Sequence, residues 1–214
     1  SYTRARRAAA RADIDYEPLP AILTVRDALA AESYLFPDRT LQRGDPHAVL
    51  PHAPRRLQGS LDIGGQDHFY LEGQIAAALP QEAGGMLVYS STQHPSEVQN
   101  MVAEALGRAA HDVVVQCRRM GGGFGGKENQ TSLFACIAAV VAQLTGRPAK
   151  LRPDRDSDMI ITGKRHDFAV NYDVGFDEHG RIQALDVRLA SRCGYSADLS
   201  APVNDRAVFH VDNC

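Results

Sequence analysis

The stretch that decides the fold reads HDVVVQCR at 111–118, RMGGGFGGK at 119–127 and ENQTSLFACIAAVVAQLTG at 128–146. The β-branched run of the first part predicts a strand. The third part is apolar on most of its faces and stops at a glycine, which predicts a buried helix beginning at Glu128. Five glycines lie between them. Their backbone must approach another group closely or adopt positive φ, so this loop is the first place to look for a site.

The flanking sequence extends the pattern in both directions. Alternating or continuous apolar runs predict strands, and apolar residues at helical spacing predict a helix that stops at Gly107. The predicted strands are 13–19, 55–63, 86–91 and 148–152, the helices are 4–12, 24–33 and 94–107, and a hairpin turns at 178–180. Two strand–helix units followed by long antiparallel strands predict an α+β fold with mixed sheets and packed helices.

The segment 36–54 is rich in Pro, Asp, Arg and His and predicts a connector. It divides the chain into predicted domains at 1–53 and 54–214.

The sequence opens inside a helix-forming Ala/Arg run and stops without a helix cap or polar tail. We therefore interpret the chain as a segment of a longer polypeptide.

Composition excludes several classes of protein. The 214 residues are 44% hydrophobic and 23% charged, which is globular composition. No apolar run reaches the length that a bilayer requires, and a net charge of −3 does not indicate a nucleic-acid partner. The four cysteines show no CxxC spacing and predict neither a zinc ribbon nor an iron–sulfur loop: Cys117, Cys136, Cys193 and Cys214. We expect a reduced, cytoplasmic protein.

Two nucleotide-binding patterns match the glycine loop only weakly. Gly121, Gly123 and Gly126 satisfy G-x-G-x-x-G, but no acidic residue follows at the distance that a ribose-binding acid requires. Gly121, Gly126 and Lys127 satisfy G-x-x-x-x-G-K, but Glu128 replaces the Ser or Thr that holds Mg²⁺. A dinucleotide-binding module stays open as an alternative, whereas the carboxylate argues against nucleotide hydrolysis.

A carboxylate at the start of a helix can serve a small-molecule pocket. The helix dipole stabilises the ionised form of Glu128, whereas desolvation in a pocket would raise the pKa of Glu128 and let it donate to a nitrogen heterocycle. A surface glutamate in a first helical turn is the simpler alternative.

We expect Lys127 to face away from the pocket or to pair with an acid. Asp154, Asp156 and Asp158 lack the glycine and distal glutamate of a calcium loop, so we expect helix-start and turn acids.

Several longer motifs resemble the molybdenum-binding part of the xanthine dehydrogenase / aldehyde oxidase family of molybdenum hydroxylases. They occur in the family's order and cover almost the whole chain: GGQDHFYLE (64–72), STQ (91–93), RRMGGGFGGKE (118–128), TGRPAKLRPDRDSDMIITGKRH (145–166) and RAVFHVDNC (206–214). The segment YEPLPAILTVRDAL (16–29) resembles the end of the family's hammerhead domain. The resemblance implies the end of a hammerhead domain followed by the first part of a molybdenum-cofactor-binding domain.

The resemblance also implies roles for five residues. Gln93 matches the glutamine beside the oxygen ligands of molybdenum, and Phe124 and Gly125 match the loop that packs over the metal. These residues form the molybdenum environment without ligating the metal, which a pterin holds. Glu128 matches the glutamate that binds and helps to protonate a purine, and Arg206 matches the arginine opposite, which stabilises charge developing on the ring.

The family reaction follows from the same resemblance. It implies oxidation of hypoxanthine and xanthine to urate, with a water-derived oxygen added to a purine carbon and hydride transferred to molybdenum. Electrons then pass to two [2Fe-2S] clusters, FAD and NAD on other domains or another subunit of an oligomer. The family's general base lies later than this chain, so the chain alone should be inactive.

The family's aldehyde-oxidising branch usually has apolar residues where this chain has Glu128 and Arg206, so the pair favours a purine. An aldehyde or other N-heterocycle hydroxylase on the same scaffold stays open. A non-catalytic partner domain is the other alternative.

Overall fold

The computed structural model describes residues 1–211. The chain consists of two compact units, of which the first ends at Tyr34 and the second begins at Leu35. The first unit holds helices α1 (Tyr2–Ala9) and α2 (Val25–Ala30). The hydroxyl of Thr24 accepts a hydrogen bond from the N–H of Asp27, which confirms the predicted start of α2. The strand predicted at 13–19 is wrong, because this segment is exposed and pairs with no other strand.

A four-stranded sheet in the second unit has the order β4-β3-β2-β5. Its strands are β2 (Ala76–Pro80), β3 (Met86–Ser90), β4 (Val113–Gln116) and β5 (Ala149–Leu151). β3 and β4 are parallel and are joined through helix α4 (Pro95–Leu106), while β2 pairs antiparallel with both β3 and β5. The predicted strand–helix units are therefore confirmed, and the sheet is mixed.

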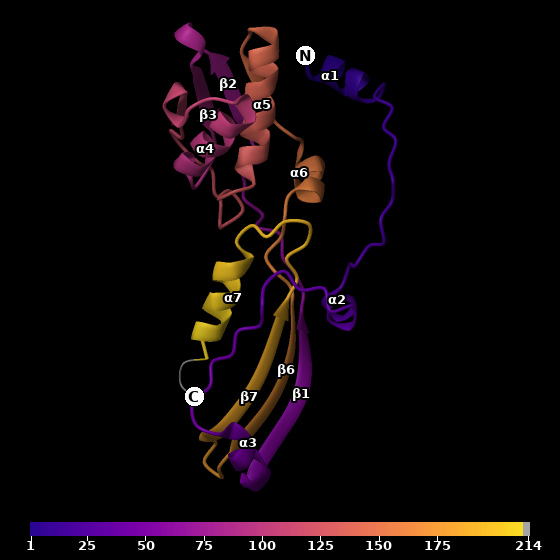
Figure 1. Ribbon diagram of the computed structural model, residues 1–214, viewed down its shortest axis with the longest axis vertical. Coiled ribbons are helices and arrows are strands. Elements are labelled where there is room, and N and C mark those ends of the chain that lie inside the picture. The colour runs from indigo at the N-terminus through magenta and orange to yellow at the C-terminus, as the bar shows by residue number, and fades with distance from the viewer. Residues whose placement is uncertain (212–214) are drawn as a thin grey trace. The chain divides into compact units, whose positions relative to one another are not determined.

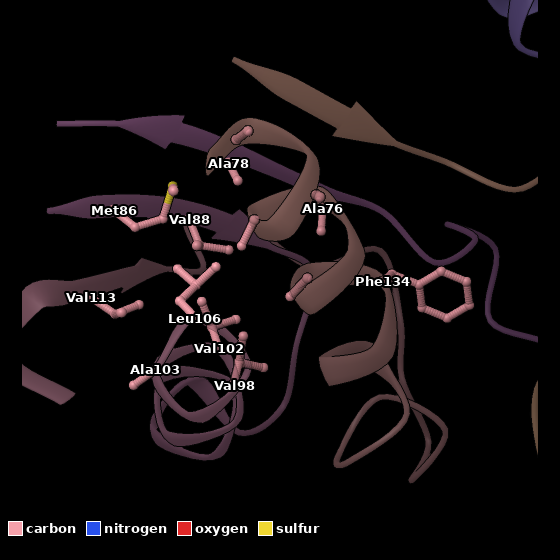
Figure 2. Close-up of a cluster of buried hydrophobic side chains, with 14 residues drawn as sticks. Ala76, Ala78, Met86, Val88, Val98, Val102, Ala103, Leu106, Val113 and Phe134 are labelled. Atoms are coloured by element: carbon pink, nitrogen blue, oxygen red, sulfur yellow. The ribbon is translucent and has the colours of Figure 1, made fainter. Parts of the chain in front are cut away.

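One face of this sheet carries the hydrophobic core (Figure 2). Alternate residues of the strands, such as Ala78 and Val88, are fully buried against α4 and helix α5 (Thr131–Thr145). α4 buries Val98 and Val102, one turn apart, and ends at Gly107 in the left-handed conformation, as its apolar spacing predicts. This core holds β4 and α5 on either side of the glycine loop.

Helix α5 differs from its prediction in two respects. It begins at Thr131 rather than at Glu128, so the site carboxylate precedes the helix. Its buried face consists mostly of small residues, including Ala135, Ala138 and Ala142, whereas large apolar residues such as Leu133 and Leu144 are exposed. Small side chains allow the helix to lie close to the sheet. The expectation of a buried helix therefore holds for one face only.

A second, three-stranded antiparallel sheet has the order β1-β6-β7 (Figure 1). Its strands are β1 (Arg55–Ile63), β6 (Phe168–Phe176) and β7 (Ile182–Ser191). β6 and β7 form the predicted hairpin, whose turn places Gly180 at a φ of +78°. The short elements of this unit are α3 (Pro46–Val49), η1 (Leu50–His52), η2 (Glu82–Gly84) and η3 (Ala110–Asp112).

Two further helices follow these sheets along the chain. α6 (Arg155–Ile161) begins after Asp154, whose carboxylate accepts a hydrogen bond from the N–H of Ser157, and α7 (Ser200–Phe209) follows β7. The predicted α+β class with mixed strands and packed helices is confirmed. The domain boundary at 53–54 and the hammerhead assignment stay predictions. No helix within residues 1–211 is long and apolar enough to cross a membrane.

Candidate active site at the glycine-rich loop

The loop between β4 and α5 has an unusual backbone. Gly122 and Gly125 have φ values of +98° and +89°, and Phe124 has a φ of +54°. A bulky residue in this region costs energy, and such strain occurs most often at functional sites. The N–H of Gly126 donates to the carbonyl of Gly123 at 2.8 Å, which closes a turn around Phe124. The ring of Phe124 is 64% exposed at the tip of this turn.

Gln93 holds the second half of the loop. Its Oε1 accepts hydrogen bonds from the N–H groups of Gly125 at 3.0 Å and Lys127 at 3.2 Å. The N–H of Gln93 donates to the carbonyl of Lys127 at 2.8 Å. A Cβ at Gly123 would lie 2.4 Å from Gln93 Oε1, so only glycine fits there. The structure thus brings Gln93 together with Phe124 and Gly125, and an amide whose oxygen is so engaged still has an NH₂ group that can donate to a further partner.

Glu128 and Arg206 line one cavity of about 350 Å³. Leu199, Pro202 and Val203 complete its lining. Glu128 is half-buried and comes from the end of the glycine loop, whereas Arg206 is exposed on α7. A carboxyl, a guanidinium and an apolar wall can together bind a flat ring that has polar edges.

Polar contacts hold the start of α7 beside the glycine loop. Asn129, the residue after Glu128, donates from Nδ2 to Asp198 Oδ1 at 2.6 Å. The ring of His166 lies 2.8 Å, through Nε2, from the hydroxyl of Ser200. These contacts explain how two residues far apart in sequence reach one cavity. The last three residues of the 206–214 motif, Asp212 to Cys214, lie outside the described residues.

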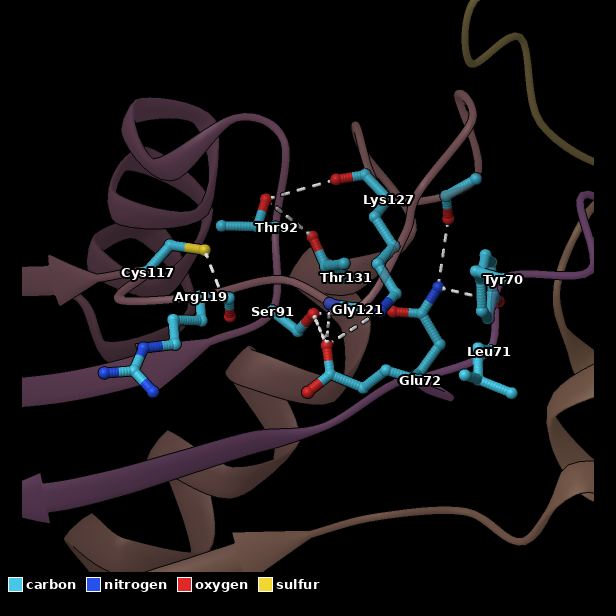
Figure 3. A network of polar contacts seen from close by, with 12 residues as sticks. Tyr70, Leu71, Glu72, Ser91, Thr92, Cys117, Arg119, Gly121, Lys127 and Thr131 are labelled. Carbon is cyan, nitrogen blue, oxygen red and sulfur yellow. Dashed lines mark hydrogen bonds and ion pairs between the residues drawn. The ribbon is translucent and has the colours of Figure 1, made fainter.

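A polar cluster that sequence reasoning missed supports the first half of the loop (Figure 3). Glu72 Oε2 accepts hydrogen bonds from the Gly121 N–H at 2.9 Å and the Ser91 hydroxyl at 2.6 Å. Lys127 Nζ lies 3.3 Å from the same Glu72 oxygen and 2.8 Å from Ser91 Oγ. The expectation that Lys127 pairs with an acid is confirmed. We refer to Glu72, Ser91 and Lys127 as the loop-support cluster.

The pKa values of the cluster reflect burial and charge. Burial lowers the pKa of Lys127 below its ordinary value, although the carboxylate of Glu72 acts in the opposite direction. Burial also acts to raise the pKa of Glu72, but hydrogen bonds from Gly121 and Ser91 and the charge of Lys127 outweigh it and lower that pKa. Glu72 therefore stays ionised around neutral pH and can anchor the loop.

A second buried network lies beneath the loop and depends on Asp158. Its carboxylate accepts a hydrogen bond from the Tyr70 hydroxyl at 2.7 Å and another from the Gln74 N–H at 2.7 Å. Burial and the hydrogen bond to Asp158 raise the pKa of Tyr70 to about 12. Gln74 Nε2 donates to the carbonyl of Gly126 at 3.0 Å, which links the network to the loop. Asp158 is thus a buried anchor, unlike Asp154, which caps a helix as expected.

We expect Asp158→Ala to destabilise the full-length protein by about 2–4 kcal/mol, because it leaves a buried hydroxyl and a buried N–H without an acceptor. The midpoint of denaturant-induced unfolding measures this loss. Asp156→Ala is the control, since Asp156 is exposed on the same helix and its loss should cost less than about 1 kcal/mol. Equal midpoints for the two variants would contradict the anchoring role.

Within residues 1–211, no group of three or more His, Cys, Asp or Glu side chains is arranged to hold a metal ion. Cys117, Cys136 and Cys193 are free thiols. The polar groups at the loop and its cavity are backbone and amide hydrogen-bonding groups, the carboxyl of Glu128 and the guanidinium of Arg206. Such a set suits an organic cofactor and a small polar substrate.

Comparison with known proteins places this arrangement in a class. The molybdopterin cofactor-binding domain family matches residues 30–214. The aldehyde oxidoreductase of Desulfovibrio gigas has a similar fold, with a TM-score of 0.77 and 27% identity over 88% of this chain and 22% of that one. The chain belongs to the molybdopterin cofactor-binding domain family.

Relatives found by sequence indicate more specifically which group of enzymes the chain resembles. The chain is 44% identical over 98% of its length to the xanthine dehydrogenase/oxidase of Felis catus. It is 41% identical over 94% of its length to the nicotinate hydroxylase hnxS of Emericella nidulans. It spans 16% and 15% of these two relatives. The resemblance to the xanthine dehydrogenase / aldehyde oxidase family is confirmed.

Proposed function

We propose that this chain forms part of the cofactor and substrate site of a molybdenum hydroxylase that oxidises hypoxanthine and xanthine to urate. The observation that carries the proposal is that Glu128 and Arg206 line the same cavity, beside the loop that Gln93 holds. Similarity to xanthine dehydrogenase/oxidase over nearly the whole chain supports it.

The residues at the loop fit a molybdenum–pterin cofactor. Gly121, Gly123 and Gly126 each pack so closely against a neighbouring side chain that a Cβ would lie within 2.8 Å of it. The resulting turn exposes Phe124 and leaves the amide NH₂ of Gln93 as a donor toward a ligand. When bound, the cofactor accepts the two electrons of the oxidation and supplies the water-derived oxygen. Gln93, Phe124 and Gly125 form its environment, and none of them ligates the metal.

The chain's own residues act on the substrate. The carboxyl of Glu128 holds a ring nitrogen of the purine and exchanges a proton with it. The guanidinium of Arg206 stabilises the negative charge that develops on the ring, so it contributes mainly in the transition state. The apolar lining from α7 packs against the flat ring. As the family resemblance implies, we propose that the general base belongs to another segment of the enzyme.

Electrons leave the site through groups on other parts of the enzyme. As the resemblance implies, we propose two [2Fe-2S] clusters, FAD and NAD on other domains or another subunit of an oligomeric enzyme. The scattered cysteines lead us to propose a cytoplasmic location.

A substrate panel on the full-length enzyme tests the proposal. We expect stoichiometric molybdenum and a kcat/KM for xanthine and hypoxanthine at least about 10-fold above that for nicotinate or small aldehydes, because the charged pair matches a purine's polar edges. A preference for nicotinate would favour another N-heterocycle hydroxylase, a possibility that the similarity to hnxS supports. An intact complex without molybdenum would instead indicate a non-catalytic partner domain.

A further inference from the structure

Lys127 is fully buried, although it carries a charge. Its ammonium lies 4.8 Å from the centroid of the Tyr70 ring, in addition to its contacts with Glu72 and Ser91. Removing a charge from water is costly unless several partners compensate for it. A lysine at this position therefore lowers the stability of the fold unless its partners compensate, and those partners indicate which part of the structure it supports.

The side chain of Lys127 reaches the first half of the loop. It contacts the Glu72 carboxylate, which in turn accepts the N–H of Gly121. The backbone supplies a second link between these segments, because the Glu72 N–H donates to the Gly121 carbonyl at 3.1 Å. A Cβ at Gly121 would lie 2.6 Å from the Cβ of Glu72. The start of the loop is thus fixed against Glu72.

The backbone of Lys127 belongs to the second half of the loop. Its N–H donates to Gln93 Oε1, and its carbonyl accepts both the Gln93 N–H and the Thr92 hydroxyl. The next residue is Glu128. Lys127 therefore joins the loop-support cluster to two of the three polar side chains that the proposed function uses, Gln93 and Glu128.

We propose that Glu72 and Lys127 are positioning residues, which fix the two halves of the glycine loop so that the Gln93 amide and the Glu128 carboxyl are held at the cofactor and the substrate. The inference rests on the proposed function. It assigns no contact with substrate or metal to either residue. Both act through the loop backbone, and Ser91 joins them.

The test is Lys127→Met in the full-length enzyme, with kcat/KM for xanthine expressed per bound molybdenum. We expect a loss of about 30-fold, because small displacements of reacting groups cost one to two orders of magnitude in rate. Arg188→Met is the control, since Arg188 is an exposed cation on β7 and does not belong to the loop-support cluster, and we expect it to change the rate less than about 2-fold. A Lys127→Met enzyme with a normal rate per molybdenum would overturn the proposal.

A double-mutant cycle separates positioning from general destabilisation. If Lys127 acts partly through Glu128, then the fold-loss in kcat/KM that Lys127→Met causes should be at least about 3-fold smaller in a Glu128→Ala enzyme than in the native enzyme. Equal losses in both backgrounds would overturn the proposal. If Glu128→Ala alone left xanthine turnover unchanged, the proposed function would fail instead, so the two failures are distinguishable.

Ser91→Ala provides a milder variant should Lys127→Met not fold. It keeps both charges but removes the hydroxyl that lies between them. We expect about a 5-fold loss per molybdenum and a lowered molybdenum content, in a protein that still folds but unfolds at a somewhat lower temperature, because one hydrogen bond to a buried charge is lost. Native rate and molybdenum content in Ser91→Ala would overturn the proposal.

Discussion

Replacing Glu128 by alanine is expected to lower kcat/KM for xanthine by about 100- to 10,000-fold in the full-length enzyme, the range that a positioned proton donor contributes. The half-buried carboxyl shares its cavity with Arg206 and an apolar wall, so it can meet a ring nitrogen in a partly desolvated setting. Alanine removes the carboxyl, and with it the hydrogen bond and the exchangeable proton that we propose it supplies to the purine. Steady-state kinetics with xanthine measure the loss.

The Glu128→Ala effect should fall on catalysis and leave folding intact. The Glu128 side chain lies at the cavity, whereas the loop itself is held by Gln93 and the loop-support cluster. Molybdenum content and unfolding temperature should therefore match those of the native enzyme. Glu104→Ala on exposed α4 surface is the control. Native xanthine kinetics in Glu128→Ala would reject the site assignment.

The parts of the fold that could be predicted from sequence depend on local pattern. The hairpin of β6 and β7 shows strand alternation on both sides of a turn that contains Gly180, and α4 shows helical spacing up to Gly107. The strand predicted at 13–19 fails because alternation alone does not supply a pairing partner. A strand exists only where another strand pairs with it, and that condition is not local.

The candidate site shows the same division. Five glycines marked the loop, and the family motifs singled out Gln93, Glu128 and Arg206. What each glycine accommodates is not visible in the sequence, since Gly121 meets Glu72 and Gly123 meets Gln93 across long separations. Glu72 and Ser91 were missed because single polar residues without regular spacing give no signal. Asp158 was expected to be a helix-start or turn acid, and its alternation with Asp154 and Asp156 does not reveal that it alone of the three is buried. A lysine within a glycine-rich, buried segment was the one available hint of the loop-support cluster.

Replacing Arg206 by methionine should lower kcat/KM for xanthine by about 100- to 1,000-fold, the cost of removing one group that stabilises charge in a transition state. Methionine keeps much of the side-chain length and lets the α7 wall of the cavity stay packed. Small aldehydes have no ring on which negative charge accumulates, so their turnover should be retained or improved. The ratio of xanthine to aldehyde kcat/KM is the measurement, because a change in enzyme concentration cancels from it.

Arg188→Met is the matched control for Arg206→Met, since Arg188 is an exposed guanidinium on β7 outside the cavity. It should leave the xanthine-to-aldehyde ratio unchanged. If Arg206→Met lowered kcat/KM equally for xanthine and for aldehydes, Arg206 would act on folding or cofactor binding rather than on charge in the purine ring. If it lowered kcat/KM for neither substrate, the cavity that Arg206 shares with Glu128 would not be the purine site. A selective loss of xanthine turnover therefore discriminates a purine site from an aldehyde site on the same scaffold.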